Sequence, residues 1–79
     1  MRYETMTRLA PAEALAAAER LFRDEYGLYV QAETPRSRSF EGGGGYVAVA
    51  VVAEHPTTLE IETHEWDALV AAFIKSLPR

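Results

Sequence analysis

The stretch that decides the fold of this chain is residues 42–53, which read GGGGYVAVAVVA. The run from Tyr46 to Ala53 is continuously apolar, rich in valine and bounded by turn residues, so it predicts a buried strand at the centre of a sheet. The four glycines from Gly42 to Gly45 predict a flexible hairpin turn before that strand. A membrane helix requires ~20 apolar residues, and this run, the longest in the chain, is far shorter.

Strands are also predicted on both sides of the central one. These segments either alternate between apolar and polar residues or contain a single apolar residue that points inward. They are residues 2–9, 28–34, 36–41 and 58–62. Pro35 ends the second of these, because proline cannot donate to a sheet ladder. Leu59 and Ile61 point inward in the last one, since the glutamates between and beside them cannot be buried unpaired.

Two segments carry apolar residues at helical spacing. The first begins at Pro11, whose missing N–H is not needed in a first helical turn, and ends before Gly27, a residue typical of C-terminal caps. The second begins after Thr63, a residue suited to the N-cap position. Its apolar stripe consists of Trp66, Leu69, Val70, Phe73 and Leu77. We expect Trp66 to anchor this second helix against the sheet.

The predicted order of elements is β-α-β-β-β-β-α, which makes residues 1–79 a single α+β domain. Two amphipathic helices must each bury one apolar face. A single antiparallel sheet of about five strands with two helices on one face satisfies that requirement. The opposite face of the sheet is then left open.

This layout resembles the TATA-binding-protein-like fold class in the order and length of its elements. Members of that class that bend DNA use a paired, basic sheet face with inserted phenylalanines. Here the corresponding face is expected to carry Glu33, Glu60 and Glu62, which does not suit DNA. The resemblance therefore concerns the fold and not the function.

The charge distribution argues against nucleic acid as a partner. The chain carries a net charge of −4, and all of it comes from residues 41–79, because residues 1–40 are balanced. A domain that binds a phosphate backbone normally presents a basic face, and the second half of this chain has none. Arginine far outnumbers lysine and alanine is abundant, a composition that suggests a GC-rich bacterial genome.

The composition also excludes common cofactor sites. The absence of cysteine excludes disulfides and thiolate metal sites, and two histidines do not make a histidine-rich one. We therefore expect no cofactor, no metal and no membrane partner. The start of the chain, Met1 to Leu9, lacks the continuous apolar stretch of a secretion signal, which makes the cytoplasm the expected compartment.

Two sequence patterns suggest ligand sites but have structural alternatives. The glycines 42–45 lead into a strand and not into a helix, so a hairpin turn is favoured over a phosphate loop. His55 and His64 lie beyond opposite ends of the strand 58–62, roughly 25–30 Å apart, which is too far for them to share a metal within one chain. We interpret both histidines as exposed residues beside turns.

A pair of carboxylates stands out in the last predicted strand. Glu60 and Glu62 share one face about 7 Å apart, a separation compatible with acid–base chemistry. The favoured interpretation is cross-strand ion pairing with Arg2 or Arg8, if the first strand is the neighbour.

Arg36 and Arg38 are the only clustered cations. They are compatible with contact to a phosphate or an acidic partner, but solvated charges that protect an edge strand are the favoured interpretation. Ser37 and Ser39, beside them, have no histidine placed to serve as a base. The sequence therefore predicts a protein that is not an enzyme.

The feature of greatest functional interest is the outer face of the predicted sheet. If Val47, Val49 and Val51 face the helices, the alternate residues of that strand face outward. The candidate interface formed by this outward set is Tyr29, Tyr46, Ala48, Ala50 and Val52. It is either the half-covered second face of a central strand or a surface for a partner or ligand.

Two functions from different classes follow from this face and from the core. The leading hypothesis is a non-enzymatic interaction domain that forms a homodimer through the outer sheet face or an edge strand. The alternative is a small-molecule-binding domain with an apolar pocket between sheet and helices, near Trp66, Phe22 and Phe73. The identity of a protein partner or ligand stays open.

Overall fold

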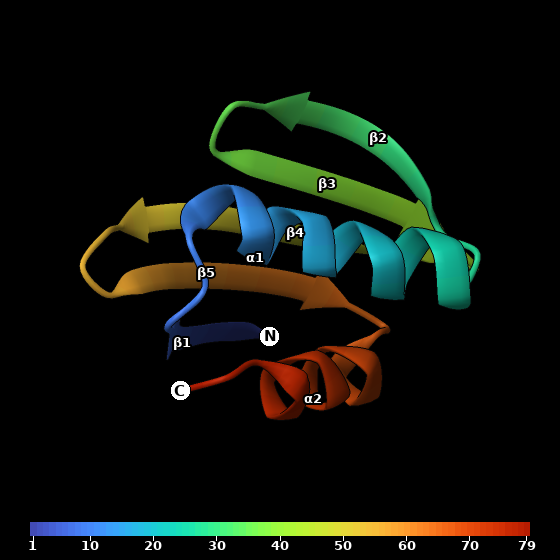
Figure 1. Ribbon diagram of the computed structural model, residues 1–79. Helices are drawn as coiled ribbons and strands as arrows, with labels where there is room; N and C mark the ends of the chain where they lie inside the picture. The colour runs from blue at the N-terminus through green and yellow to red at the C-terminus, as the bar shows by residue number, and fades with distance from the viewer.

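A computed structural model describes residues 1–79 and contains one five-stranded antiparallel sheet with helices on one of its faces (Figure 1). The strands are β1 (Arg2–Thr7), β2 (Tyr29–Thr34), β3 (Ser37–Gly42), β4 (Gly45–Ala53) and β5 (Thr57–His64). The helical segments are α1 (Pro11–Ala18), its π-helical continuation η1 (Glu19–Glu25) and α2 (Asp67–Ser76). The predicted α+β class, element order and single antiparallel sheet are confirmed.

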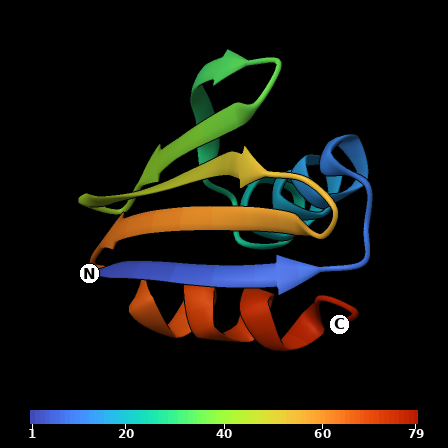
Figure 2. The ribbon, with the colours of Figure 1, turned by 90° about the vertical axis from the view of Figure 1, so that its left-hand side faces the viewer.

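β4, the strand predicted from the apolar run, lies at the centre of the sheet, whose order is β1-β5-β4-β3-β2. The edges of the sheet are therefore β1 and β2. Helices α1 and η1 pack against β2, β3 and β4, whereas α2 packs against β5 and runs along β1 (Figures 1 and 2). No helix of the chain has the length and apolar character needed to cross a membrane.

The core lies between β4 and the helices. Val47, Val49 and Val51 are at most 5% exposed, and they face a cluster of three phenylalanine rings. The rings belong to Phe22, Phe40 and Phe73. The centroid of Phe22 lies 5.4 Å from that of Phe40 and 5.3 Å from that of Phe73, with tilted planes, an arrangement in which aromatic side chains attract one another. The sheet and both helices thus share one packed core.

The inner face of β1 and β5 contains buried threonines whose hydroxyl groups are bonded to the main chain. Thr7 Oγ1 donates to the carbonyl oxygen of Pro78 at 2.5 Å, and Thr57 Oγ1 donates to that of Leu9 at 2.6 Å. Buried hydroxyl groups need such partners because burial removes them from water. The bond from Thr7 also holds the C-terminal segment beside β1, which begins at the N-terminus, so both termini lie close to this strand (Figure 1).

The side-chain alternation of β2 reverses part-way along the strand. The pairing with β3 shifts between Val30 and Ala32 and leaves Gln31 as a bulge. Glu33 consequently pairs with Arg38, and both residues belong to the set that points toward the helix side of the sheet. The prediction that Glu33 lies on the outer face is therefore wrong, because one extra residue in a strand turns every later side chain to the opposite face.

The second helix begins later than predicted. β5 continues through Thr63 to His64, and the chain then turns at Glu65, whose φ is 77°. Thr63 is buried, and its Oγ1 donates to the carbonyl oxygen of Tyr46 at 2.8 Å. The prediction that Thr63 caps the helix is wrong, because its hydroxyl is used inside the sheet and α2 starts at Asp67.

Trp66 packs against the glycine turn between β3 and β4. The turn itself consists of Gly43 and Gly44, both with positive φ, because Gly42 and Gly45 already pair as strand residues. Trp66 Nε1 donates to the carbonyl oxygen of Gly42 at 2.9 Å. The indole also contacts the core, as expected, but it precedes α2 and holds the hairpin as well as the helix.

Substitution of the two turn glycines by alanine tests this packing. Gly43→Ala and Gly44→Ala both force alanine into the left-handed region, a penalty of about 1–2 kcal/mol. A Cβ atom at Gly43 would also lie 2.6 Å from the Trp66 ring, whereas a Cβ atom at Gly44 meets nothing. We expect Gly43→Ala to lower the free energy of unfolding by ~1–3 kcal/mol more than Gly44→Ala does, measured by urea denaturation.

The Trp66→Ala background is the control for that experiment. Without the indole, the two glycine substitutions should have equal effects on the free energy of unfolding. Equal effects in the wild-type background would mean that Trp66 does not pack on the turn.

Candidate functional site

The outer face is the side of the sheet that turns away from α1, η1 and α2. The five residues predicted for the candidate interface are exposed or half-buried in the structure, and none belongs to the core. They are Tyr29, Tyr46, Ala48, Ala50 and Val52. Val52 lies where the pairing of β4 with β5 shifts, between Val51 and Ala53. The predicted outward parity is thus confirmed for Tyr46, Ala48 and Ala50, while the role of this face in binding stays a prediction.

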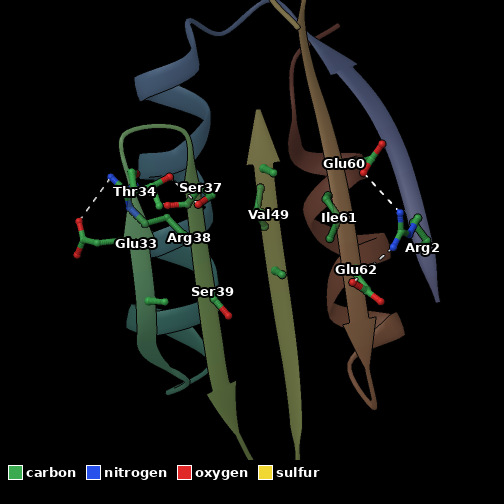
Figure 3. Close-up of a pocket in the computed structure, with 13 residues that line it drawn as sticks. Arg2, Glu33, Thr34, Ser37, Arg38, Ser39, Val49, Glu60, Ile61 and Glu62 are labelled. Atoms are coloured by element: carbon green, nitrogen blue, oxygen red, sulfur yellow. Dashed lines mark hydrogen bonds and ion pairs between the residues drawn. The ribbon is translucent and has the colours of Figure 1, made fainter. Parts of the chain in front are cut away.

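The middle of the outer face is a shallow concavity of about 180 Å³ (Figure 3). Ala48 and Ala50 lie at its centre, on β4. Their cross-strand neighbours are Ser37 and Ser39 on β3, and Glu60 and Glu62 on β5. Small side chains therefore cover the centre and one side of the concavity, and charged side chains cover the other.

The charged side is organised around Arg2. Its guanidinium lies 3.7 Å from a carboxylate oxygen of Glu60 and 3.7 Å from one of Glu62 (Figure 3). The predicted ion pairing of both glutamates is confirmed with Arg2 and not with Arg8. A pair of carboxyl groups divides the roles of acid and base only when the two groups have different environments, whereas these two share one cation in contact with solvent. Glu4 lies opposite Glu60 in the register, which adds a third carboxylate to this side.

A row of aromatic side chains borders the outer face beside the glycine turn. Tyr29 and Tyr46 flank Glu41 across three strands, and the Tyr29 hydroxyl donates to the Glu41 carboxylate at 3.2 Å. The ring of Tyr46 stacks on that of His64, with centroids 6.3 Å apart. His64 and His55 are both exposed, as predicted; His64 is the last residue of β5, and His55 lies in the turn between β4 and β5.

Arg38 does not lie on an edge strand. β3 has β2 on one side and β4 on the other, and the Arg38 side chain is only 18% exposed. Its Nε donates to a carboxylate oxygen of Glu19 in η1, and its Nη1 donates to the main-chain carbonyl oxygens of Thr34 and Ser37. The interpretation as a solvated edge-strand charge is therefore wrong for Arg38, which joins the β2–β3 hairpin to η1.

Arg36 behaves differently although it is only two residues away. It lies in the turn between β2 and β3, is 52% exposed, and pairs with Glu54 at 2.9 Å. One signal in the sequence could have separated the two arginines. Arg38 lies two residues before Phe40, which is fully buried, so within the strand it had to turn toward the helices. Arg36 has the same parity but directly follows Pro35 and lies in the turn outside β3, so the position of the strand start is what separates them.

The two arginines make a matched pair of variants. We expect Arg38→Met to lower the free energy of unfolding by about 1.5–3 kcal/mol, because it removes charge-assisted hydrogen bonds from a largely buried site. Arg36→Met removes an exposed ion pair and should change it by less than ~1 kcal/mol. Thermal and urea unfolding measure both values, and a ranking in the reverse order would contradict the assignment of Arg38 as the hairpin–helix link.

The space beneath the sheet is filled by the phenylalanine cluster. No surface hollow is lined by Phe22, Phe40 or Phe73, each of which is at most 1% exposed. A small molecule between sheet and helices would therefore have to separate rings that are already in contact.

The comparisons with known proteins add no family to this geometry. No protein-family model matches the chain, and a search of the curated proteins finds no match.

The hydrogen bond between Tyr29 and Glu41 has a measurable consequence. That bond, followed by the carboxylate charge and by desolvation, raises the pKa of Tyr29 above the ordinary value of 10.0. Because the folded state holds this proton more tightly, the stabilisation is complete below pH 10 and is lost as the pH rises through the pKa of Tyr29. We expect Glu41→Gln to bring the pKa of Tyr29 back toward 10.0 in an NMR titration of the tyrosine rings.

Tyr3 supplies the internal control. Burial and the hydrogen bond to Asp67 raise its pKa too, so Glu41→Gln should leave the pKa of Tyr3 unchanged and Asp67→Asn should lower it. If Glu41→Gln does not move the titration of Tyr29, the two side chains are not paired on the outer face.

Proposed function

We propose that this chain is a non-enzymatic interaction domain that forms a homodimer through the outer face of its sheet. The observation that supports the proposal is the contrast between the two faces of β4. Val47, Val49 and Val51 on the inner face are buried in the core. Ala48 and Ala50 on the outer face are only half-buried, and no helix lies over them (Figures 1 and 2).

The side chains of the outer face suit contact with a second sheet. Alanines and serines at its centre are short, so another sheet can reach the ~10 Å spacing of packed sheets without rearrangement. Two larger apolar side chains project from the same face, Tyr29 and Met6, each at 58% exposure. A tyrosine adds apolar area and a polar tip, a combination that is enriched in protein interfaces.

We favour the outer face over an edge strand. β2 has a bulge at Gln31 and is followed by Pro35, and both features disfavour pairing with a further strand. β1 has α2 running along it in both views of the ribbon, which restricts approach to that edge (Figures 1 and 2).

The variant Ala50→Arg tests the proposal. It introduces a long side chain at the centre of the outer face, where its bulk would hold two packed sheets apart even if its charge pairs with Glu60 on the neighbouring strand. We expect the wild-type protein to be a dimer at micromolar concentration, and Ala50→Arg to be a monomer with unchanged circular dichroism. Light scattering coupled to size-exclusion chromatography measures both masses.

Ala72→Arg is the matched control, because Ala72 is exposed on α2 and away from the outer face. It adds the same side chain and should stay dimeric, with a stability within ~0.5 kcal/mol of the wild type. A wild-type protein that is monomeric at millimolar concentration, or an Ala50→Arg variant that still dimerises, would rule out the outer face as the interface.

A further inference from the structure

We infer that the two-fold axis of this dimer runs parallel to β4 and passes over Ala48 and Ala50. This inference rests on the proposed function, and it adds the relative orientation of the two copies. With that axis, β5 of one protomer faces β3 of its partner and β1 faces β2.

An interface on the outer face has to use nearly all of it. The chain measures 34 × 23 × 20 Å along its principal axes. Its largest projected face is therefore on the order of 800 Å², about the area that each partner contributes to a standard stable interface. The charged strands β1 and β5 consequently fall inside the interface and cannot be left outside it.

The two halves of the outer face differ strongly in charge. The β1–β5 half carries the carboxylates of Glu4, Glu60 and Glu62 and a single cation, Arg2. Among its outward side chains the β2–β3 half carries one carboxylate, Glu41, which accepts a hydrogen bond from Tyr29. Glu33 and Arg38 also line the concavity from this half, and their opposite charges form an ion pair at 4.0 Å. The other outward side chains of that half are Ala32, Thr34, Ser37 and Ser39. The face is therefore acidic on one side of β4 and almost uncharged on the other.

Two limiting directions of an in-plane two-fold axis keep the strands of the two sheets aligned. If the axis lies across the strands, each strand faces its own copy, and the acidic half of one protomer, with three carboxylates and one cation, meets the acidic half of its partner. If the axis lies along β4, each acidic half meets an almost uncharged half. Like charges brought together inside an interface are strongly unfavourable, so the charges select the axis along β4. Both directions fit the aligned mode of sheet packing, in which strands of the two sheets run within about 30° of one another, so the charges alone distinguish them.

Single cysteines distinguish the two arrangements, because the natural chain contains none. A bismaleimide of ~10 Å reach spans the distance between packed sheets. Ala50→Cys lies near the axis in both arrangements and reports any face-to-face dimer. A mixture of the Thr34→Cys variant (on β2) with the Met6→Cys variant (on β1) reports the axis along β4, because only that axis brings β2 of one protomer over β1 of its partner. Within one protomer these two strands lie four strand spacings, ~19 Å, apart. Thr34→Cys alone reports the axis across the strands.

We expect crosslinked dimer from Ala50→Cys and from the mixture of Thr34→Cys with Met6→Cys, and several-fold less from Thr34→Cys alone. A reversed pattern, or an Ala50→Cys product without the mixed product, overturns the axis along β4 and leaves the face-to-face dimer in place. Failure of Ala50→Cys to crosslink, together with a monomeric mass in light scattering, overturns the proposed function itself.

Discussion

Burial of the inner side of β4 is the constraint on which the rest of the structure depends. Val47, Val49 and Val51 lie against the phenylalanine cluster, and burial of each such side chain contributes about 1.5–3 kcal/mol. A slip of one residue would place alanines in the core and expose the valines, so the register of the central strand is strongly determined. Hydrogen bonds to β4 then set the positions of the neighbouring strands. Both helices pack on the side of the sheet where the valines lie.

Two polar side chains then join parts of the chain that the core alone would leave loosely connected. Trp66 donates to the main chain of the β3–β4 hairpin, which links the start of α2 to the turn between these two strands. Arg38 bonds the β2–β3 hairpin to η1 through Glu19. Both contacts satisfy polar groups that are partly or largely removed from water, so each stabilises the fold only while both partners are present. A thin core in a chain of this size makes such links important.

The same parity that buries the valines leaves small side chains at the centre of the outer face. This part of the candidate site could be predicted from the sequence, because alternation along one strand is a local property and Tyr46, Ala48 and Ala50 follow from it. The ion pairs of Arg2 with Glu60 and Glu62 could also be anticipated once β1 was taken as the neighbour of β5. The division of the face into an acidic half and an almost uncharged half could not, because it depends on the order of all five strands.

By itself the sequence determined the type and order of the elements and the buried side of β4, since periodicity, turn residues and helix-ending residues all act over a few positions. Only the tertiary structure decided where β2 changes face, where α2 begins and what Arg38 and Trp66 bond. A bulge at Gln31 and the extension of β5 through Thr63 arise from pairing with other strands. The bonds of Arg38 to Glu19 and of Trp66 to Gly42 join residues 19 and 24 positions apart. Such contacts form only when the folded chain brings their partners together, so no local pattern in the sequence predicts them.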